Sequence, residues 1–187
     1  MKKILFLAAC FLAAPVLAEK ADSGKRTTIE ADAVDIDDVT QTKVLTGKVE
    51  IHRGTLVMKS DNAVVKESPD GYQTAVLTSA PGKMANFRQK RDGGADLWIE
   101  GQAERIEYDQ KNELVRLYKT AKIRQLDGTR LENEIDSEFI SYDSRKEVFS
   151  GRNDASGENK AGKGRVILIM EPRQPKPAAS APVPGKQ

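Results

Sequence analysis

The chain has 187 residues, of which 39% are hydrophobic, 31% charged and 5% aromatic, with one cysteine and one histidine. That length is sufficient for one domain with a sizeable core. A single Cys and a single His supply too few ligands for an ordinary zinc site. The formal charge is only +2, and no basic block interleaved with aromatic residues is present, which argues against nucleic-acid binding.

Residues 1–18 have the pattern of a secretory signal peptide. Basic residues precede an apolar run over 4–14, and small residues end at Ala18, which predicts cleavage between Ala18 and Glu19. The run is shorter than the roughly 20 residues that a membrane-spanning helix needs. A lipoprotein signal ending at Cys10 is the alternative, but only about half of a normal apolar region precedes that residue, so ordinary cleavage is favoured.

Cleavage at this position changes the charge and the cysteine content of the chain. It removes the only cysteine and two lysines, so 28 of the 30 basic residues remain against 28 acidic residues, and the net charge becomes zero. The mature chain would have no disulfide even in an oxidising compartment. A net charge near zero favours association with other chains.

Apolar and polar residues alternate with a period of two along most of the chain. The pattern is clearest over 43–52, where Leu45, Val49 and Ile51 share one face. Such alternation predicts antiparallel strands that have one apolar face and one face in water. Strands are expected at 28–37, 43–52, 55–66, 72–79, 83–90, 97–108, 113–124, 130–142, 146–151 and 165–171.

Turn-forming and polar segments separate these strands. No long segment has the apolar spacing of a helix, and Asp-Gly pairs such as Asp70-Gly71 and Asp127-Gly128 predict tight turns. The first and last strands have no neighbour beyond them in the sequence, so both are expected at sheet edges. The expected organisation is a signal peptide at 1–18, a lead-in at 19–27, one β domain at 28–171 and a disordered Pro-rich tail at 172–187.

A short motif recurs four times along the expected β domain. It consists of a small residue, two spacers, an apolar residue, one spacer, and then an apolar residue or Tyr. Its last positions are separated by 29, 43 and 34 residues, and a repeat of short strands at this spacing predicts a stacked β architecture. The copies run from Ala31 to Ile36, Ser60 to Val65, Ala103 to Tyr108 and Ser137 to Tyr142.

Catalytic and metal-binding patterns are weak. His52 lies in a turn with no G-x-S-x-G motif nearby, so a surface residue at a strand end is favoured over a member of a catalytic triad. The cluster Asp32, Asp35, Asp37 and Asp38 lacks the glycine and closing glutamate of a calcium loop. A carboxylate-based polysaccharide hydrolase remains an alternative, although no acidic pair is flanked by the aromatic platforms of a glycan cleft.

The apolar residues of the expected strands form one extended face. It is either the dry core of a ligand-free structural β-repeat protein or, in part, a groove for an apolar ligand. Aliphatic residues outnumber aromatic ones, which suits hydrocarbon better than sugar. Burying an acyl chain of about twelve carbons at about 0.8 kcal/mol per CH₂ is worth on the order of 10 kcal/mol. The face comprises Ile29, Ile36, Leu45, Val49, Ile51, Leu56, Met58, Val65, Leu77, Phe87, Ile99, Ile106, Tyr108, Leu117, Ile123 and Tyr142.

Several strand segments together resemble the OstA-like domain of periplasmic lipopolysaccharide-transport proteins. The resemblance extends over about 28–170, and it includes the signal peptide and a polar tail. The basic segment 88–94 and the Pro-rich tail depart from the family pattern. The segments that carry it are Ile29-Glu30-Ala31-Asp32, Leu45-Thr46-Gly47-Lys48-Val49-Glu50-Ile51, Gly54-Thr55-Leu56-Val57-Met58, Ile99-Glu100-Gly101, Ile106-Glu107-Tyr108 and the strand around Leu117.

The resemblance implies an all-β fold, an open and twisted jelly roll whose two sheets diverge as a V around an apolar groove. It implies a periplasmic carrier that binds the acyl chains of lipopolysaccharide and passes the lipid from the inner to the outer membrane, with no catalytic turnover and no cofactor or metal. By position, the residues expected to line the groove are Ile29, Ile36, Leu45, Val49, Ile51, Leu56, Met58, Phe87, Ile106, Tyr108, Leu117 and Ile123.

The same resemblance implies partners. Domains of this family stack head to tail through their edge strands, so the chain is expected to associate with itself. It is also expected to associate with the inner-membrane-anchored C component and with the periplasmic domain of the outer-membrane D component of the lipopolysaccharide transport machinery. Exposed sheet edges are normally a liability, and pairing with a similar domain would satisfy them.

Overall fold

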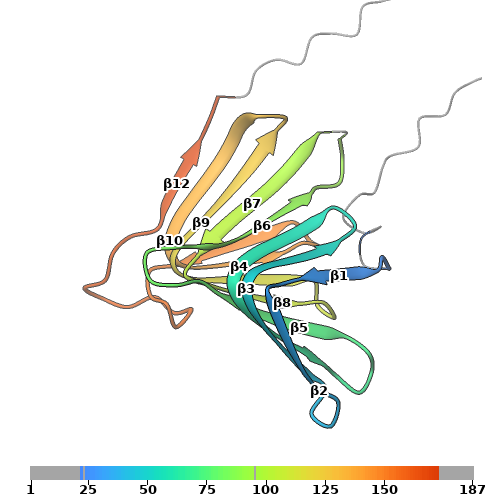
Figure 1. Ribbon diagram of the computed structural model, residues 1–187. Helices are drawn as coiled ribbons and strands as arrows, with labels where there is room; N and C mark the ends of the chain where they lie inside the picture. The colour runs from blue at the N-terminus through green and yellow to red at the C-terminus, as the bar shows by residue number, and fades with distance from the viewer. Residues whose placement is uncertain (1–21, 23, 95, 173–187) are drawn as a thin grey trace, which may run out of the picture.

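The computed structural model describes residues 22, 24–94 and 96–172, and twelve antiparallel strands account for most of them (Figure 1). The expected signal peptide and most of the expected tail lie outside the described residues. No described helix has the length and hydropathy required to cross a membrane. The strands are β1 Thr27–Glu30, β2 Ala33–Asp37, β3 Thr42–Arg53, β4 Leu56–Glu67, β5 Gln73–Thr78, β6 Ala85–Lys90, β7 Leu97–Ala103, β8 Arg105–Asp109, β9 Leu114–Asp127, β10 Arg130–Asp143, β11 Val148–Arg152 and β12 Ile167–Met170.

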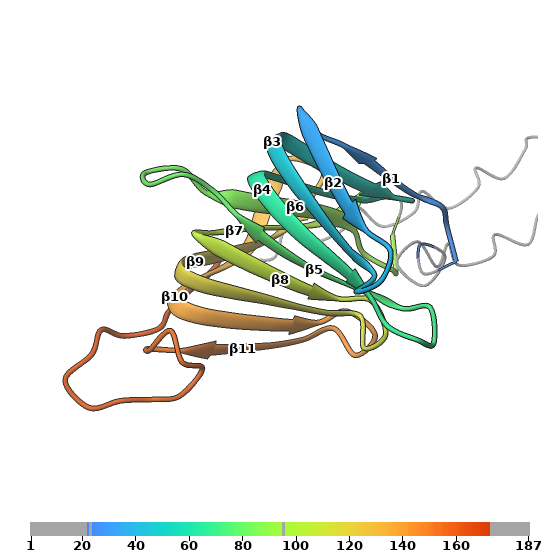
Figure 2. The same ribbon diagram turned by 60° about the horizontal axis from the view of Figure 1, so that its bottom comes forward.

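The strands form two sheets that diverge from a common bend, as the two arms in Figure 1 show. Sheet I has the order β1-β3-β4-β6-β7-β9-β10-β12, and sheet II has the order β2-β3-β4-β5-β8-β9-β10-β11. The long strands β3, β4, β9 and β10 belong to both sheets. Figure 2 shows sheet II from β2 to β11. The chain thus makes eight passes across the bend, in sequence order, within the part of the chain that is described.

The four-fold sequence motif marks the passes that run from sheet I to sheet II. Its small residues, Ala31, Ser60, Ala103 and Ser137, all lie at the bend, where strands leave sheet I. The two apolar positions that follow lie in sheet II, as for Ile106 and Tyr108. A small side chain is required at the bend because the backbones of the two sheets converge there.

Passes in the opposite direction use left-handed backbone conformations. In β3, Gly47 and Lys48 have φ of 79° and 46°, and the register with β4 shifts between Thr46 and Val49. In β9, Lys119 and Thr120 have φ of 62° and 49°. A β-bulge of this kind bends a strand and increases its twist, and this is how β3 and β9 enter both sheets.

The bend also explains the two places where the expected strands are wrong. The segment 28–37 is two strands, interrupted where the Asp32 amide donates to the carbonyl of Gly47. The segment 97–108 is likewise divided into β7 and β8, where the Glu104 amide donates to the Lys119 carbonyl. The alternation shifts by one residue at each bend, from Ala31 to Val34 and from Ala103 to Ile106. The apolar pattern resumes at once on the other side, so each segment was expected as one continuous strand.

The hydrophobic core lies between the inner faces of the two sheets. Its large members, such as Leu77, Ile99 and Tyr142, are 0% exposed. Burying each of them contributes about 1.5–3 kcal/mol. Alanines occupy inner positions close to the bend, where the sheets are nearest, and at one position farther along β5: Ala63, Ala75, Ala85, Ala103 and Ala121.

Candidate functional site: the interior between the sheets

The structure brings together ten of the twelve residues expected to line a groove. They come from both sheets, face one another across the interior and are at most 7% exposed. Ile29 is partly buried against them. Ile36 is the exception at 62% exposed. The ten are Leu45, Val49, Ile51, Leu56, Met58, Phe87, Ile106, Tyr108, Leu117 and Ile123.

Side chains fill most of this interior. A cavity near β1 has a volume of about 20 Å³ and is lined by residues of both sheets, among them Ile29, Ile51, Met58 and Tyr108. That volume holds roughly one water molecule. A hydrocarbon chain therefore enters this interior only if the two sheets move apart.

The interior reaches both ends of the molecule without being covered. At one end, Val34 and Ile36 of β2 pair with Leu45 and Lys43, on the same face of sheet II as the core; they are 47% and 62% exposed. At the opposite end, Leu168 of β12 pairs with Ile135 on the inner face of sheet I and is 55% exposed. The core thus continues into an apolar surface at each end.

The strands at these ends are free on one side. Among the described residues, β1 and β2 pair only with β3, and β11 and β12 pair only with β10. The first and last strands are therefore edge strands, as expected from the sequence. Strand β12 exposes apolar side chains on both faces, and such an edge is a template for pairing with another chain.

Two polar contacts connect the sheets at the open side of the V. Arg53 of sheet I donates a hydrogen bond to the Tyr108 hydroxyl of sheet II. Burial raises the pKa of Tyr108, and the neighbouring guanidinium opposes that rise in part. Farther along, Arg91 lies 3.3 Å from Glu132 of sheet I and 4.0 Å from Glu147 in the β10–β11 turn.

Arg91 belongs to the basic segment 88–94, which departs from the family pattern. In the structure this segment ends β6 and begins the turn toward β7. Its Arg91 side chain is only 13% exposed. The segment therefore supplies a contact that joins the two sheets, in addition to a solvated turn.

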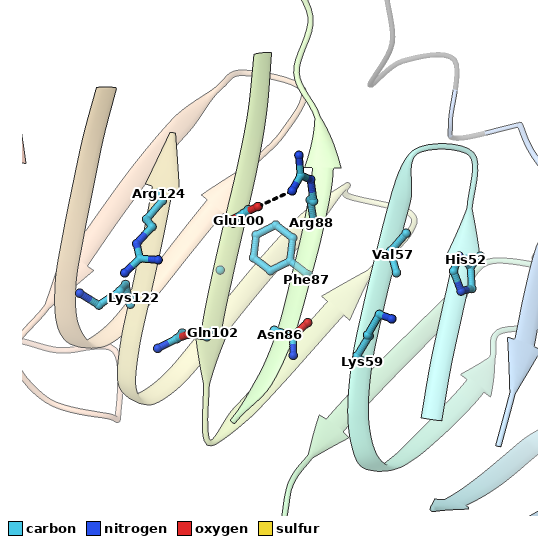
Figure 3. A pocket seen from close by; sticks show the side chains of 11 residues that line it. His52, Val57, Lys59, Asn86, Phe87, Arg88, Glu100, Gln102, Lys122 and Arg124 are labelled. Carbon is cyan, nitrogen blue, oxygen red and sulfur yellow. Dashed lines mark hydrogen bonds and ion pairs between the residues drawn. The ribbon is translucent and has the colours of Figure 1, made fainter. Parts of the chain in front are cut away.

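The outer face of sheet I carries a shallow pocket of about 530 Å³, shown in Figure 3. Its cations are matched by carboxylates: Arg88 lies 2.7 Å from Glu100, and Lys122 lies 2.6 Å from Glu134. Burial would raise the pKa of Glu134, but hydrogen bonds from Lys122 and Arg124 outweigh it and lower that pKa. The outer face is thus charged, paired and polar, in contrast to the interior.

The residues considered for catalysis or metal binding have ordinary structural contacts. The His52 Nε2 atom is 3.2 Å from Glu50 on the outer face. Asp37 accepts hydrogen bonds from the amides of Val39 and Thr40, which close the β2–β3 turn, and these lower the pKa of Asp37. Within the described ranges no group of His, Cys, Asp and Glu could hold a metal ion.

Sequence reasoning missed Arg53, which the structure places on the inner face. The alternation that begins with Val49 and Ile51 continues to position 53 and indicates an inward side chain there. The turn His52-Arg53-Gly54 suggested a solvated residue instead, because arginine is seldom buried without a partner.

Comparison with known proteins relates this chain to lipopolysaccharide transport proteins. Residues 28–148 match the family described as "LptA/(LptD N-terminal domain) LPS transport protein". The lipopolysaccharide export system protein LptA of Haemophilus influenzae is 29% identical over 92% of each chain. The export system protein LptH of Pseudomonas aeruginosa is 23% identical over 91% of this chain and 93% of its own.

A solved structure shows the same fold. The crystal structure of LptH from Pseudomonas aeruginosa, described as the LptA-homologous periplasmic component of the lipopolysaccharide transport device, covers 81% of this chain and 99% of its own, with a TM-score of 0.69 and 20% identity. The two proteins thus share a fold. Because the family match extends over well more than half of the chain, this protein belongs to the LptA/LptD N-terminal domain family of lipopolysaccharide transport proteins.

Proposed function

We propose that this protein is a periplasmic carrier of lipopolysaccharide, which receives the lipid from the inner membrane side and passes it toward the outer membrane. The observation that carries the proposal is an apolar interior that continues to both ends of the molecule. Family membership supports the substrate, and the curated relatives are named as lipopolysaccharide export proteins. An N-terminal signal peptide cleaved between Ala18 and Glu19 would deliver the chain to the periplasm.

The acyl chains are proposed to lie between the inner faces of the two sheets. Side chains such as Leu117 and Ile123 are flexible aliphatics that lose contacts with one another when the sheets part. An acyl chain replaces those contacts, so the net cost of opening is offset by burial of hydrocarbon at about 0.8 kcal/mol per CH₂. Transfer of the lipid in this scheme breaks no covalent bond, and the carrier performs no catalysis.

Head-to-tail stacking is proposed to join the interiors of successive domains. Strands β1 and β2 at one end and β11 and β12 at the other have free backbone groups toward solvent. Pairing of unlike ends is heterologous and propagates, whereas a two-fold contact would stop at a dimer. The membrane-anchored C component and the periplasmic domain of the D component would pair with the same edges.

Site-specific photo-crosslinking in cells tests the position of the lipid. A crosslinker at Ile36, Leu45 or Tyr108, on the inner face, is expected to capture lipopolysaccharide. Matched probes at Lys48 and Glu50, which point to solvent or to the outer face, are expected to capture none. Equal labelling at the two sets of positions would refute an acyl-binding interior.

A further inference from the structure

Arg53 is a buried cation without an anionic partner. The residue is 5% exposed at the end of β3. Its guanidinium donates to the Tyr108 hydroxyl and lies 5.2 Å from the centre of the Tyr108 ring. The buried Nε atom has no hydrogen-bond partner. A guanidinium has five N–H donors, so Arg53 retains unused capacity for an acceptor.

Two partly buried cations in the described chain, Arg91 and Lys122, are matched by carboxylates. Arg91 lies beside Glu132 and Glu147, and Lys122 lies beside Glu134 and Asp136. No such ion pair is present at Arg53 among the described residues. A buried charge without its counter-charge destabilises a fold, so the position of Arg53 calls for an explanation beyond packing.

Asp22, an acidic residue beside the turn that follows Arg53, does not supply that counter-charge. Asp22 lies against the β3–β4 turn, where its carboxylate accepts hydrogen bonds from the amide and the hydroxyl of Thr55. Those contacts hold the carboxylate over the turn. The buried Nε–H of Arg53 is therefore left for an acceptor outside the described chain.

The surroundings of Arg53 indicate what kind of molecule would carry the acceptor group. Arg53 and Tyr108 line the small cavity near β1, and most of its other lining is apolar, including Ile51, Leu56 and Val65. Thr27 and Ile29 of β1, an edge strand of sheet I, line the same cavity. A ligand that matches both the unpaired cation and the apolar lining has an anionic group bonded directly to a hydrocarbon-rich body.

We propose that Arg53, with Tyr108, binds the phosphate group of an anionic lipid whose hydrocarbon lies in the interior. The inference rests on the proposed function and adds the recognition of the head group. When the sheets part to admit the hydrocarbon, Arg53 loses its contact with Tyr108. A phosphate oxygen then accepts from the guanidinium, which suits phosphate geometry, and the Tyr108 hydroxyl is free to donate to a second oxygen.

Isothermal titration calorimetry with three probes tests this proposal. Decyl phosphate has both the phosphate group and an alkyl chain, decyl glucoside has the same chain with a neutral head, and inorganic phosphate has no chain. The alkyl probes are used below their critical micelle concentrations. The wild-type protein is expected to bind decyl phosphate roughly tenfold more tightly than decyl glucoside, as one charge-assisted hydrogen bond predicts. Inorganic phosphate is expected to bind far more weakly than either.

The Arg53→Met variant keeps a long side chain and removes the charge. It is expected to lose the preference for decyl phosphate and to keep its affinity for decyl glucoside. Its thermal midpoint should equal or exceed that of the wild type, because an unpaired buried charge is removed. Arg88→Met, on the outer face, is the matched control and should leave the preference unchanged.

Each outcome decides between the claims. Retention of the head-group preference in Arg53→Met, or its absence in the wild type, overturns the phosphate site and leaves the acyl-binding interior intact. Inorganic phosphate that binds as tightly as decyl phosphate overturns the assignment to a lipid. Failure of both alkyl probes to bind overturns the proposed interior site, and the inference that rests on it.

Discussion

Replacing Gly101 by alanine tests how tightly the interior is packed. Gly101 of β7 pairs with Phe87 of β6 on the inner face. A Cβ at position 101 would lie 2.9 Å from Cδ1 of the Phe87 ring, closer still to its Cε1, and 3.0 Å from Cδ2 of Leu117. The added methyl group therefore meets a ring from its own sheet and an aliphatic side chain from the opposite sheet.

Two effects of opposite sign decide the stability of Gly101→Ala. Alanine in a strand is intrinsically better than glycine by about 0.5–1 kcal/mol. Overpacking a filled core costs about 1–3 kcal/mol, and Phe87 and Leu117 are 1% and 0% exposed, so neither can move into solvent. We expect a net loss of about 1–2 kcal/mol, which lowers the thermal midpoint by roughly 2–8 °C for a domain of this size.

Thermal and urea unfolding followed by circular dichroism measures this loss. The double variant Phe87→Leu, Gly101→Ala provides the control, because a shorter side chain at position 87 makes room for the methyl group. In that background the cost of Gly101→Ala should fall by at least about 1 kcal/mol, a coupling typical of residues in contact. A single Gly101→Ala variant as stable as the wild type would show that the interior is loosely packed.

Three further predictions concern the two faces and the edges. Leu117→Asp buries a carboxylate in a fully buried site and should cost several kcal/mol, whereas Lys119→Asp, at a 63% exposed side chain, should cost less than about 1 kcal/mol; similar urea midpoints would mean that the assigned faces are reversed. Ile36→Asp should leave stability within about 0.5 kcal/mol of the wild type, because the residue is exposed, yet reduce lipopolysaccharide crosslinking at Leu45. Proline at Leu168, whose amide faces away from β10 in this register, should lower the molar mass measured by light scattering at high concentration, since it removes an edge donor; a monomer at every concentration would exclude pairing through β12.

The period-two pattern predicts the strands and the core well, and it fails at the bend. Leu45, Ile51 and Ile123 lie where the alternation places them. Ala63 and Ala103 belong to the sequence motif, but Ala75, Ala85 and Ala121 of the core were not predicted, because alanine is uncommon in strands and its preference depends on context. Ala85 and Ala121 are buried for a reason that lies in the tertiary structure: the sheets converge near the bend and leave no room for a larger side chain.

The interior position of Arg53 was equally beyond sequence reasoning, although the alternation pointed to it. A charged residue in a turn is usually solvated. Only the pairing of β3 with β1 and β4 shows that the strand continues through position 53. At Arg53 the alternation and the turn signal disagree. Such disagreement is informative, because local sequence rules fail most often at functional sites.

The topology itself favours a conduit over a closed core. Because eight passes cross the same bend in sequence order, every pass adds the same two layers to the interior, at about 4.8 Å per strand. Nothing in such a meander closes the ends, in contrast to a barrel, whose first and last strands pair. The exposed side chains of Ile36 and Leu168 therefore mark the two open ends of the interior among the described residues. Another domain that paired with β1 and β2, or with β11 and β12, would continue both sheets at the same spacing, and it would cover these side chains with the equivalent residues of its own interior.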